Sequence, residues 1–399
     1  MNALPQLHSR TVLVVRSELL RYSETFVRQQ VLSYVNWRPV LVGLERVAGL
    51  PTEDLRVRLL PSSRTIAARA YRKVLRSLQI PPPGIRRRLL GESPSLIHVH
   101  FGTDAVDHWD WIRAFDLPIV VTLHGYDINI SRRWWKDPAQ SPARRRYPGR
   151  LLQMAADPRV HFVAVSQAIA RRASEWGIAP ERISVRHIGV DTRSFRRTGP
   201  PLWERKPTVL FTGRLSEKKG VEYLIRAFAE VKKQLSSAEL VIIGDGSLRQ
   251  GLEQLAAQLN VPVSFLGAQG NDEVQRQLQR ARVFCSPSVT AANGDAEGLP
   301  IVILEAQACG VPVVTSARGG AEEGIIDGVT GFAFREKEVD TLARHLLYLL
   351  RDGAAAERMG QAGRRHIASK FDLRRCTGEL ERLYDHLTLG YPQAIEAVG

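Results

Sequence analysis

Short runs of apolar residues recur along the whole chain, and stretches with helical periodicity separate them. In the first half the runs cover residues 11–15, 39–43, 96–100, 118–124, 161–166 and 183–189. In the second half they cover residues 208–213, 239–246, 263–267, 283–288 and 311–316. Continuous apolar strands that alternate with helices indicate parallel sheets buried on both faces. Two such series in 399 residues predict two doubly wound α/β domains.

The predicted domain boundary is the segment 196–207, which is rich in proline and charge and has no periodicity. We therefore expect an N-terminal domain over residues 1–198 and a C-terminal domain over residues 207–371. Residues 372–399 are expected to form a C-terminal helix that packs back on the N-terminal domain. The predicted helices cover residues 24–36, 66–78, 103–115, 167–176, 219–235, 247–259, 272–281, 300–309, 338–351, 354–369 and 373–388.

Composition restricts the class of protein. With 44% hydrophobic and 24% charged residues, the chain is expected to be globular. No run approaches the roughly 18 apolar residues of a membrane-spanning helix, and the first residues lack the apolar core of a signal peptide. The three cysteines have no metal-ligand spacing, which favours reduced thiols. We therefore expect a cytoplasmic protein.

The formal net charge of +15 is unevenly distributed. Residues 1–200 contain 32 Lys and Arg against 16 Asp and Glu, whereas residues 201–399 contain 24 against 25. All of the excess positive charge therefore lies in the first half, which predicts an anionic partner for that half.

Two segments concentrate this charge. Residues 56–88 contain ten basic residues and no acidic one, and within them 66–78 has the pattern of a basic amphipathic helix. The basic positions of that helix are Arg69, Arg72, Lys73 and Arg76. The second segment, 131–150, places Trp134 and Trp135 among seven Arg and Lys in what we expect to be a proline-containing loop, as in an interfacial anchor. The alternative is a solvated basic helix and a loop whose tryptophans pack inward; we favour contact with an anionic membrane surface, because polybasic and aromatic signals occur together.

The second half carries two charged motifs at strand-to-helix junctions, where open parallel sheets bind ligands. GRLSEKKG (213–220) provides Arg214 and Lys219, which suit phosphate oxygens, although a Lys-rich surface turn would also explain it. EGLPIVILE (297–305) provides Glu297 and Glu305, which suit hydroxyls. A ligand with a diphosphate at one end and hydroxyls at the other is a nucleotide sugar.

Glu305 is the most informative of these residues. Its neighbours 301–304 are all apolar, so the helix is expected to be buried, and a buried carboxylate needs a specific partner. Ribose hydroxyls would provide one, and so would a buried Arg or Lys. Gly213, Gly244 and Gly246 would let the backbone approach a ligand, although a tight turn explains the glycines of IGDGSLR (243–249) nearly as well.

These motifs, together with GGAEEGI (319–325), resemble the retaining glycosyltransferases of family 4, which have the GT-B fold of two Rossmann-like domains facing a central cleft. The likeness extends through SETFVRQQ (23–30), HVHFG (98–102), TLHGYDI (122–128), VAVSQAI (163–169) and HIGVDTRSF (187–195), and so covers nearly the whole chain. The SETF and HGYD elements resemble the branch that builds exopolysaccharides such as colanic acid or amylovoran.

The resemblance implies a role for each matching residue. Arg214 and Lys219 would hold the donor diphosphate and stabilise the leaving group without a metal. Glu297 would face the donor sugar near the reacting carbon, and Glu305 would hold the ribose. His124, from the first domain, would reach toward the donor sugar. The nucleotide would be lined by Gly244, Gly246, Gly298 and Leu299.

Two departures from the family pattern are visible. Many relatives have a glycine pair after the first strand, where this chain has RSELLRYSETF, and the role would pass to Ser23, Glu24 and Thr25. Glu322 replaces a proline in GGAEEGI, while Glu323 keeps the family position.

Some polar residues of the first half have more than one interpretation. His98 and His100 alternate onto one strand face, but no third metal ligand is evident, so a histidine that touches substrate or is simply packed is expected. Asp127 could orient His124 or cap a turn. Ser166 is expected to cap the helix at 167–176.

We therefore predict a retaining hexosyltransferase that uses a nucleotide-diphosphate sugar and a lipid-linked glycan acceptor, peripheral on the inner face of the cell membrane, with no cofactor and no metal. One alternative is a GT-B synthase that acts on a soluble acceptor. Another is a basic nucleic-acid-binding protein, suggested by a pI of about 10.2, but no nucleic-acid module is recognisable. A catalytically silent scaffold is disfavoured by the intact set of Arg214, Lys219, Glu297 and Glu305.

Overall fold

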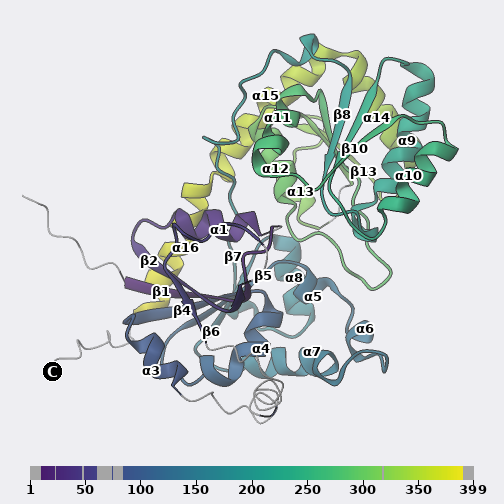
Figure 1. The fold of residues 1–399 in the computed structure, drawn as a ribbon. Coiled ribbons are helices and arrows are strands. Elements are labelled where there is room, and N and C mark those ends of the chain that lie inside the picture. Colours follow the sequence, from purple (N-terminus) through teal and green to yellow (C-terminus); the bar gives the residue numbers. More distant parts are fainter. Residues whose placement is uncertain are drawn as a thin grey trace, which may run out of the picture. The chain divides into compact units, whose positions relative to one another are not determined.

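The computed structural model of the protein describes residues 10–22, 24–46, 49–60, 74, 84–316 and 319–389 (Figure 1). Contacts between residues divide the described chain into two compact units. The first unit contains the residues within Met1–Val165, Ile169–Ile188 and Leu373–Gly399, and the second contains Ser166–Ala168 and Gly189–Asp372. Residues 196–207 belong to the second unit.

The first unit is built on a seven-stranded sheet with the order β3-β2-β1-β4-β5-β6-β7, in which all neighbouring strands are parallel. Its strands are β1 (Arg10–Leu19), β2 (Trp37–Arg46), β3 (Val57–Leu59), β4 (Pro94–His100), β5 (Ile119–Leu123), β6 (Val160–Ala164) and β7 (Ile183–Val185). Consecutive apolar residues such as Val12, Leu13 and Val14 are fully buried, as expected for strands covered on both faces.

The helices of this unit lie between the strands and at the end of the chain. They are α1 (Thr25–Leu32), α3 (Ile85–Leu90), α4 (Gly102–Ile112), α5 (Tyr126–Asn129), α6 (Arg132–Lys136), α7 (Pro142–Ala155), α8 (Gln167–Glu175), the 3-10 helix η1 (Pro180–Arg182) and α16 (Leu373–Thr388). Helix α16 packs on the sheet, because Leu380 and Leu383 join a buried cluster with strand residues such as Leu96. The Tyr384 hydroxyl lies 2.5 Å from Nδ1 of His98 on β4.

The second unit is built on a six-stranded parallel sheet with the order β10-β9-β8-β11-β12-β13. Its strands are β8 (Thr208–Thr212), β9 (Glu239–Ile243), β10 (Val263–Gly267), β11 (Val283–Ser286), β12 (Val313–Ser316) and β13 (Gly331–Phe334). Its helices are α9 (Val221–Gln234), α10 (Arg249–Gln258), α11 (Asn271–Arg280), α12 (Ile301–Ala308), α13 (Ala321–Gly324), α14 (Val339–Arg351), α15 (Gly353–Lys370) and the 3-10 helices η2 (Leu202–Glu204) and η3 (Glu217–Lys219). The prediction of two doubly wound parallel sheets is confirmed.

Helix α9 shows how this sequence positions a site. Leu224, Phe228 and Val231 recur at helical spacing and are fully or almost fully buried, which fixes the helix against the sheet. Gly220, just before the helix, has φ of +60°, and a Cβ there would clash with the carbonyl oxygen of Pro287. The glycine therefore lets the charged loop after β8 lie directly against the segment that follows β11.

The basic segment 131–150 differs from the prediction. We expected a loop, but the structure has two helices, α6 and α7, whose first turns are capped by the hydroxyls of Ser131 and Ser141. Pro142 occupies the first turn of α7, where a missing N–H costs nothing. Trp135 is 2% exposed and packs against Tyr126 and Tyr147, so it cannot act as an interfacial anchor in this state.

The basic positions Arg69, Arg72, Lys73 and Arg76 and the predicted site residue Ser23 lie outside the described residues. Within the described part of the chain, no helix combines the length and the apolar character needed to cross a bilayer.

Candidate functional site

The loop that follows β8 places two cations at the carboxyl edge of the second unit's sheet. Arg214 comes two residues after the end of the strand and is exposed, and within the described part of the chain its guanidinium has no ion-pair partner. Lys219 ends the short helix η3, and its side chain is 15% exposed. One cation is therefore open to solvent, while the other points into the protein.

Lys219 meets one of the two predicted carboxylates. Its Nζ lies 2.7 Å from Oε1 of Glu297, and the Ser288 hydroxyl donates to the same oxygen at 3.3 Å. Burial alone would raise the pKa of Glu297, but Lys219 and Lys218 hold this pKa below its usual value. Glu297 is therefore a stabilised anion at neutral pH.

A second ion pair lies alongside the first. Nζ of Lys218 is 3.1 Å from a carboxylate oxygen of Asp295, and both side chains are largely buried. Burial acts to lower the pKa of Lys218, but Glu297 and Asp295 together raise it. Sequence reasoning missed both residues, although Lys218 adjoins Lys219 and Asp295 lies two residues before Glu297.

Glu305 lies on α12, as predicted, and is 6% exposed. Within the described residues its carboxyl group has neither a hydrogen-bond donor nor a cation, and burial raises its pKa to about 7. A buried carboxyl group without a partner is costly, so the alternative of a buried Arg or Lys receives no support from the described chain. The site is therefore able to accept hydrogen bonds from the hydroxyls of a ligand.

The predicted glycines of this edge bring loop backbones together. A Cβ at Gly244, which has φ of +139°, would clash with the carbonyl oxygen of Gly213. A Cβ at Gly246 would clash with that of Leu215. Close packing of the loops after β8 and β9 thus explains these glycines, and it is what places the backbone of residues 213–215 at the edge of the sheet.

The backbone around Gly298 is equally constrained. A Cβ at Gly320 would clash with the carbonyl oxygen of Gly298, which also accepts a hydrogen bond from the Ser166 hydroxyl at 2.9 Å. Leu299 is 7% exposed. The backbone N–H of Gln167, which belongs to the second unit, donates to the carboxylate of Glu323 at 2.7 Å.

In the first unit, three histidines lie at the carboxyl ends of β4 and β5. His98 is fully buried between the Thr122 hydroxyl, at 2.7 Å from Nε2, and the Tyr384 hydroxyl. His100 and His124 share a hydrogen bond of 3.0 Å between Nδ1 and Nε2. Burial lowers the pKa of all three imidazoles, to about 3 for His98. For His100 and His124, Arg16 and the neighbouring histidines lower the pKa further. His124 is therefore a neutral, half-buried imidazole.

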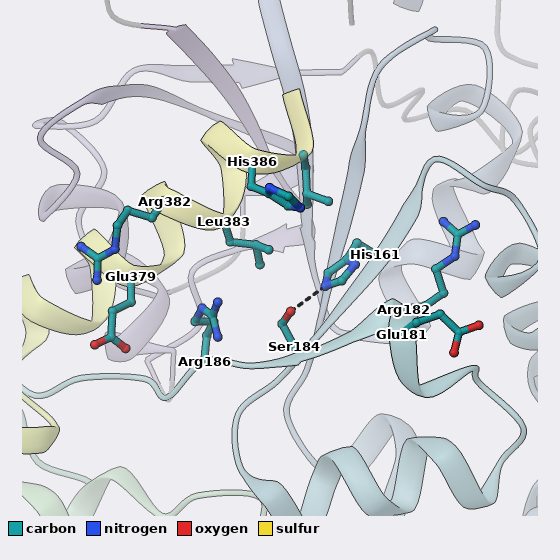
Figure 2. Close-up of a pocket in the computed structure, with 10 residues that line it drawn as sticks. His161, Glu181, Arg182, Ser184, Arg186, Glu379, Arg382, Leu383 and His386 are labelled. Carbon is teal, nitrogen blue, oxygen red and sulfur yellow. Dashed lines mark hydrogen bonds between the residues drawn. The ribbon is translucent and has the colours of Figure 1, made fainter. Parts of the chain in front are cut away.

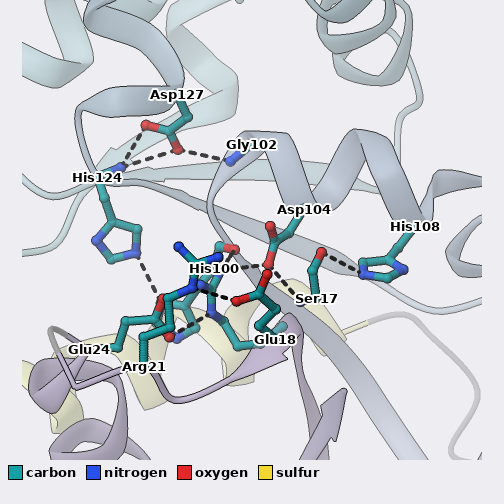
Figure 3. Close-up of polar contacts among 11 residues, drawn as sticks. Ser17, Glu18, Arg21, Glu24, His100, Gly102, Asp104, His108, His124 and Asp127 are labelled. Atoms are coloured by element: carbon teal, nitrogen blue, oxygen red, sulfur yellow. Dashed lines mark hydrogen bonds and ion pairs between the residues drawn. The ribbon is translucent and has the colours of Figure 1, made fainter. Parts of the chain in front are cut away.

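Asp127 caps a turn. Its carboxylate accepts hydrogen bonds from the backbone N–H groups of Gly102 at 2.8 Å and His124 at 3.1 Å (Figure 3). It accepts a further one from the N–H of Gly125 at 2.9 Å. Since it touches the backbone of His124 and not its ring, it positions the loop that carries the imidazole.

The carboxyl-terminal part of β1 takes part in a buried charge network that sequence reasoning missed (Figure 3). The guanidinium of Arg16, which is 6% exposed, lies 2.5 Å from the carboxylates of both Glu24 and Asp104 and donates to the His100 carbonyl at 3.0 Å. Burial raises the pKa of Asp104 to about 6, although Arg16 and the N–H of Ser17 oppose this. The carboxylate of Glu24 pairs with Arg16, and Thr25 is the first residue of α1; the ligand contact expected of both stays a prediction.

The structure thus brings Lys219 and Glu297 into contact, and it brings His100 and His124 into contact. Among the described residues, no group of three or more His, Cys, Asp or Glu could hold a metal ion, and metal independence stays a prediction.

Comparison with known proteins identifies the family of this chain. Residues 38–194 match the family described as Glycosyltransferase Family 4, and residues 193–366 match Glycosyl transferases group 1. The GDP-mannose-dependent alpha-(1-6)-phosphatidylinositol monomannoside mannosyltransferase of Mycolicibacterium smegmatis is 32% identical over 321 residues, 75% of this chain and 80% of that protein. The amylovoran biosynthesis glycosyltransferase AmsK of Erwinia amylovora is 32% identical over 228 residues, 57% of this chain and 56% of that protein. The chain spans little more than half the length of several such curated relatives.

A solved structure supports the fold. Anabaena HepE in complex with UDP and glucose superimposes with a TM-score of 0.75 at 19% sequence identity, over 95% of this chain and 100% of that chain. At this identity the likeness concerns the fold alone. With two adjoining family matches and a relative that is 32% identical over most of both chains, this protein belongs to glycosyltransferase family 4 and has the GT-B fold.

Proposed function

We propose that this protein transfers a hexose from a nucleoside-diphosphate sugar to a lipid-linked glycan acceptor, in polysaccharide or glycolipid biosynthesis. The observation that carries the proposal is the open charge set of the second unit: an exposed Arg214, the Lys219–Glu297 pair, and a buried Glu305 that has no partner among the described residues. The printed names of the mannosyltransferase and amylovoran relatives agree with this reaction. The UDP and glucose bound to the HepE structure agree with a nucleotide-sugar donor.

The cations would act on the leaving group. When the bond to the sugar breaks, negative charge builds up on the departing nucleoside diphosphate, and preorganised donors stabilise this charge most where water is scarce. Arg214 offers a planar fork for phosphate oxygens, and Lys219 has three N–H donors, so it can keep Glu297 and still serve a phosphate oxygen. This account requires no metal.

The carboxylates would act on the sugar and the ribose. Glu305 would accept hydrogen bonds from ribose hydroxyls, which satisfy its otherwise unpartnered group. Glu297 would stand near the reacting carbon and stabilise its developing positive charge. Because Lys219 holds it as an ion pair, we assign it no nucleophilic role, and retention would follow from front-side attack within an ion pair.

The acceptor side would lie in the first unit. We propose that its basic surface contacts the anionic inner face of the cell membrane, because the residues 144–146 at the start of α7 are three exposed arginines. The buried position of Trp135 favours the alternative of a soluble acceptor. Flotation with anionic vesicles separates the two, since an enzyme for a soluble acceptor would stay unbound.

The proposal is tested with the purified protein in EDTA and a panel of nucleotide sugars. We expect slow release of nucleoside diphosphate from one donor, measured by phosphorus NMR, and the first-formed free hexose to keep the donor's anomeric configuration in proton NMR. Arg214→Ala should abolish release, whereas Arg276→Ala, which removes an exposed arginine paired with Glu273 on α11, should not. Equal release by both variants would contradict the assigned donor site.

A further inference from the structure

A polar cavity of about 760 Å³ lies in the first unit, between helix α16 and the strands β6 and β7 (Figure 2). The strand side contributes His161, Ser184 and Arg186, and the helix side contributes Arg382 and His386. The volume lies within the range of roughly 300–1,000 Å³ that is common for small-molecule sites. The cavity is separate from the carboxyl ends of β4 and β5, where His100 and His124 lie.

The strand pattern builds one wall of this cavity. Side chains alternate along a strand, so Ser184 takes one face of β7 while Ile183 and Val185 take the other, and Arg182 and Arg186 come directly before and after the strand. His161 lies on the neighbouring strand, and its Nε2 is 2.8 Å from the Ser184 hydroxyl. The edge of the sheet therefore presents a polar, cationic surface to α16, where an apolar one would pack directly.

The charges around the cavity are not balanced. Three arginines and two histidines line it, against Glu181 and Glu379, and Glu379 already pairs with Arg375 at 3.2 Å. Arg382 is exposed and has no ion-pair partner in the described part of the chain. Nε of Arg186 is buried, and no described group accepts its hydrogen bond. Nη1 of Arg186 donates to the Val185 carbonyl at 2.7 Å, so the other N–H groups of Arg186 and the guanidinium of Arg382 are available to a ligand.

The pKa of His161 is affected by the same excess of positive charge around the cavity. Burial lowers its pKa to about 4, and the nearby Arg182, Arg186 and His386 contribute to this lowering. A positive potential inside a partly enclosed cavity attracts anions. Because planar guanidiniums match phosphate oxygens in pairs, a phosphate group is the anion that fits best.

We propose that this cavity is a binding site for a phosphate-bearing ligand, separate from the donor site. Arg186 and Arg382 would hold the phosphate from opposite walls, with Ser184 donating a hydrogen bond between them. The site would also explain part of the excess positive charge of the first half, to which Arg186 belongs. The ligand is either a soluble phosphate ester or the headgroup of a phospholipid, which share this chemistry.

The test uses the full chain carrying Arg214→Ala, so that binding at the donor diphosphate site is weakened. Inorganic pyrophosphate is titrated into this protein by calorimetry, and then into versions that also carry Arg186→Gln or Arg382→Gln. Each substitution removes one charge-assisted contact, so we expect at least about tenfold weaker binding. Arg171→Gln, an exposed arginine on α8, serves as the matched control and should change nothing.

Folding is checked separately for each variant. Arg382 is exposed, so Arg382→Gln should keep the thermal unfolding temperature of its parent, and a loss of binding there cannot be ascribed to unfolding. The proposal is overturned if pyrophosphate does not bind the Arg214→Ala protein, or if it binds equally to the versions with Arg186→Gln, Arg382→Gln and Arg171→Gln.

A second arm identifies the source of the phosphate. Flotation is compared for phosphatidylcholine vesicles with and without phosphatidic acid. If Arg382→Gln lowers flotation with phosphatidic acid and Arg171→Gln does not, the ligand is a lipid headgroup. If Arg382→Gln weakens pyrophosphate binding but leaves flotation unchanged, the ligand is a soluble phosphate ester. Either result supports the site, and neither bears on the proposed sugar transfer.

Discussion

Both units carry charged residues at the carboxyl edge of a parallel sheet, but the two sets of charges are arranged differently. In the first unit, Arg16 is enclosed by Glu24 and Asp104 at 2.5 Å each, so the charges satisfy one another. In the second unit, Arg214 is exposed and Glu305 is buried without a described partner. A closed network stabilises a loop, whereas an open set has free capacity for a ligand.

The largest expected effect concerns the closed network. Arg16→Met leaves two buried carboxylates without their cation, so we expect the free energy of unfolding to fall by about 3–5 kcal/mol. Urea unfolding followed by tryptophan fluorescence measures it, because six of the seven tryptophans lie in the first unit. Lys206→Met, which breaks the exposed pair with Glu239, should cost at most about 1 kcal/mol. Equal losses in both variants would show that the network is not structural.

The next prediction separates the two cations of the donor site. Lys219→Met should slow transfer or donor hydrolysis by about 10²–10³-fold, the loss typical of a removed transition-state donor. It should also lower the free energy of unfolding by about 1–3 kcal/mol, because Glu297 loses its partner. Arg214→Ala should slow the reaction without this loss of stability, since Arg214 is exposed. If both variants keep full stability, the Lys219–Glu297 pair contributes nothing to the fold.

Glu305 predicts a pH dependence of stability. Burial raises its pKa to about 7, whereas an unfolded glutamate titrates near about 4.3. Between these values the folded protein binds more protons, so this group lowers the free energy of unfolding as the pH rises. Relative to the wild type, Glu305→Gln should therefore gain about 3 kcal/mol between pH 4.5 and pH 8.

Urea unfolding at these two pH values measures the difference, with Glu204→Gln, an exposed glutamate, as control. A difference between wild type and Glu305→Gln that stays constant with pH would mean that the carboxylate already has a partner.

The smallest effect concerns the surface of the first unit. Each arginine near an anionic membrane contributes about 1 kcal/mol, so Arg145→Gln should weaken binding to phosphatidylserine vesicles about fivefold. Trp134→Phe, at a half-buried position on α6, should change binding less than this. Binding that is unaffected by Arg145→Gln would remove α7 from the membrane proposal.

The sequence predicted both sheets because their strands are continuously apolar and short. It predicted the bounds of α12 to within one or two residues. It also predicted that Glu305 is buried, because the four residues before it on the helix are all apolar. It missed α6 and α7 because Pro142 looked like a breaker, although at the first turn of a helix proline is tolerated.

The sequence pattern could not predict contacts between residues that lie far apart in the chain. Arg16 and Asp104 are 88 residues apart, and only the order of the strands brings β1 beside the first turn of α4, the helix that follows β4. The burial of Trp135 likewise depends on Tyr126 and Tyr147, which no local period connects to it. Such contacts follow from the tertiary structure and not from spacing.

The open donor site is tested most directly by a thermal-shift panel of UDP, GDP, ADP, CMP and dTDP in EDTA. Wild type and Arg276→Ala should be stabilised by one of the diphosphates, and Arg214→Ala should not respond to it. No shift with any nucleotide from folded protein, or the same shift in Arg214→Ala, would contradict the account.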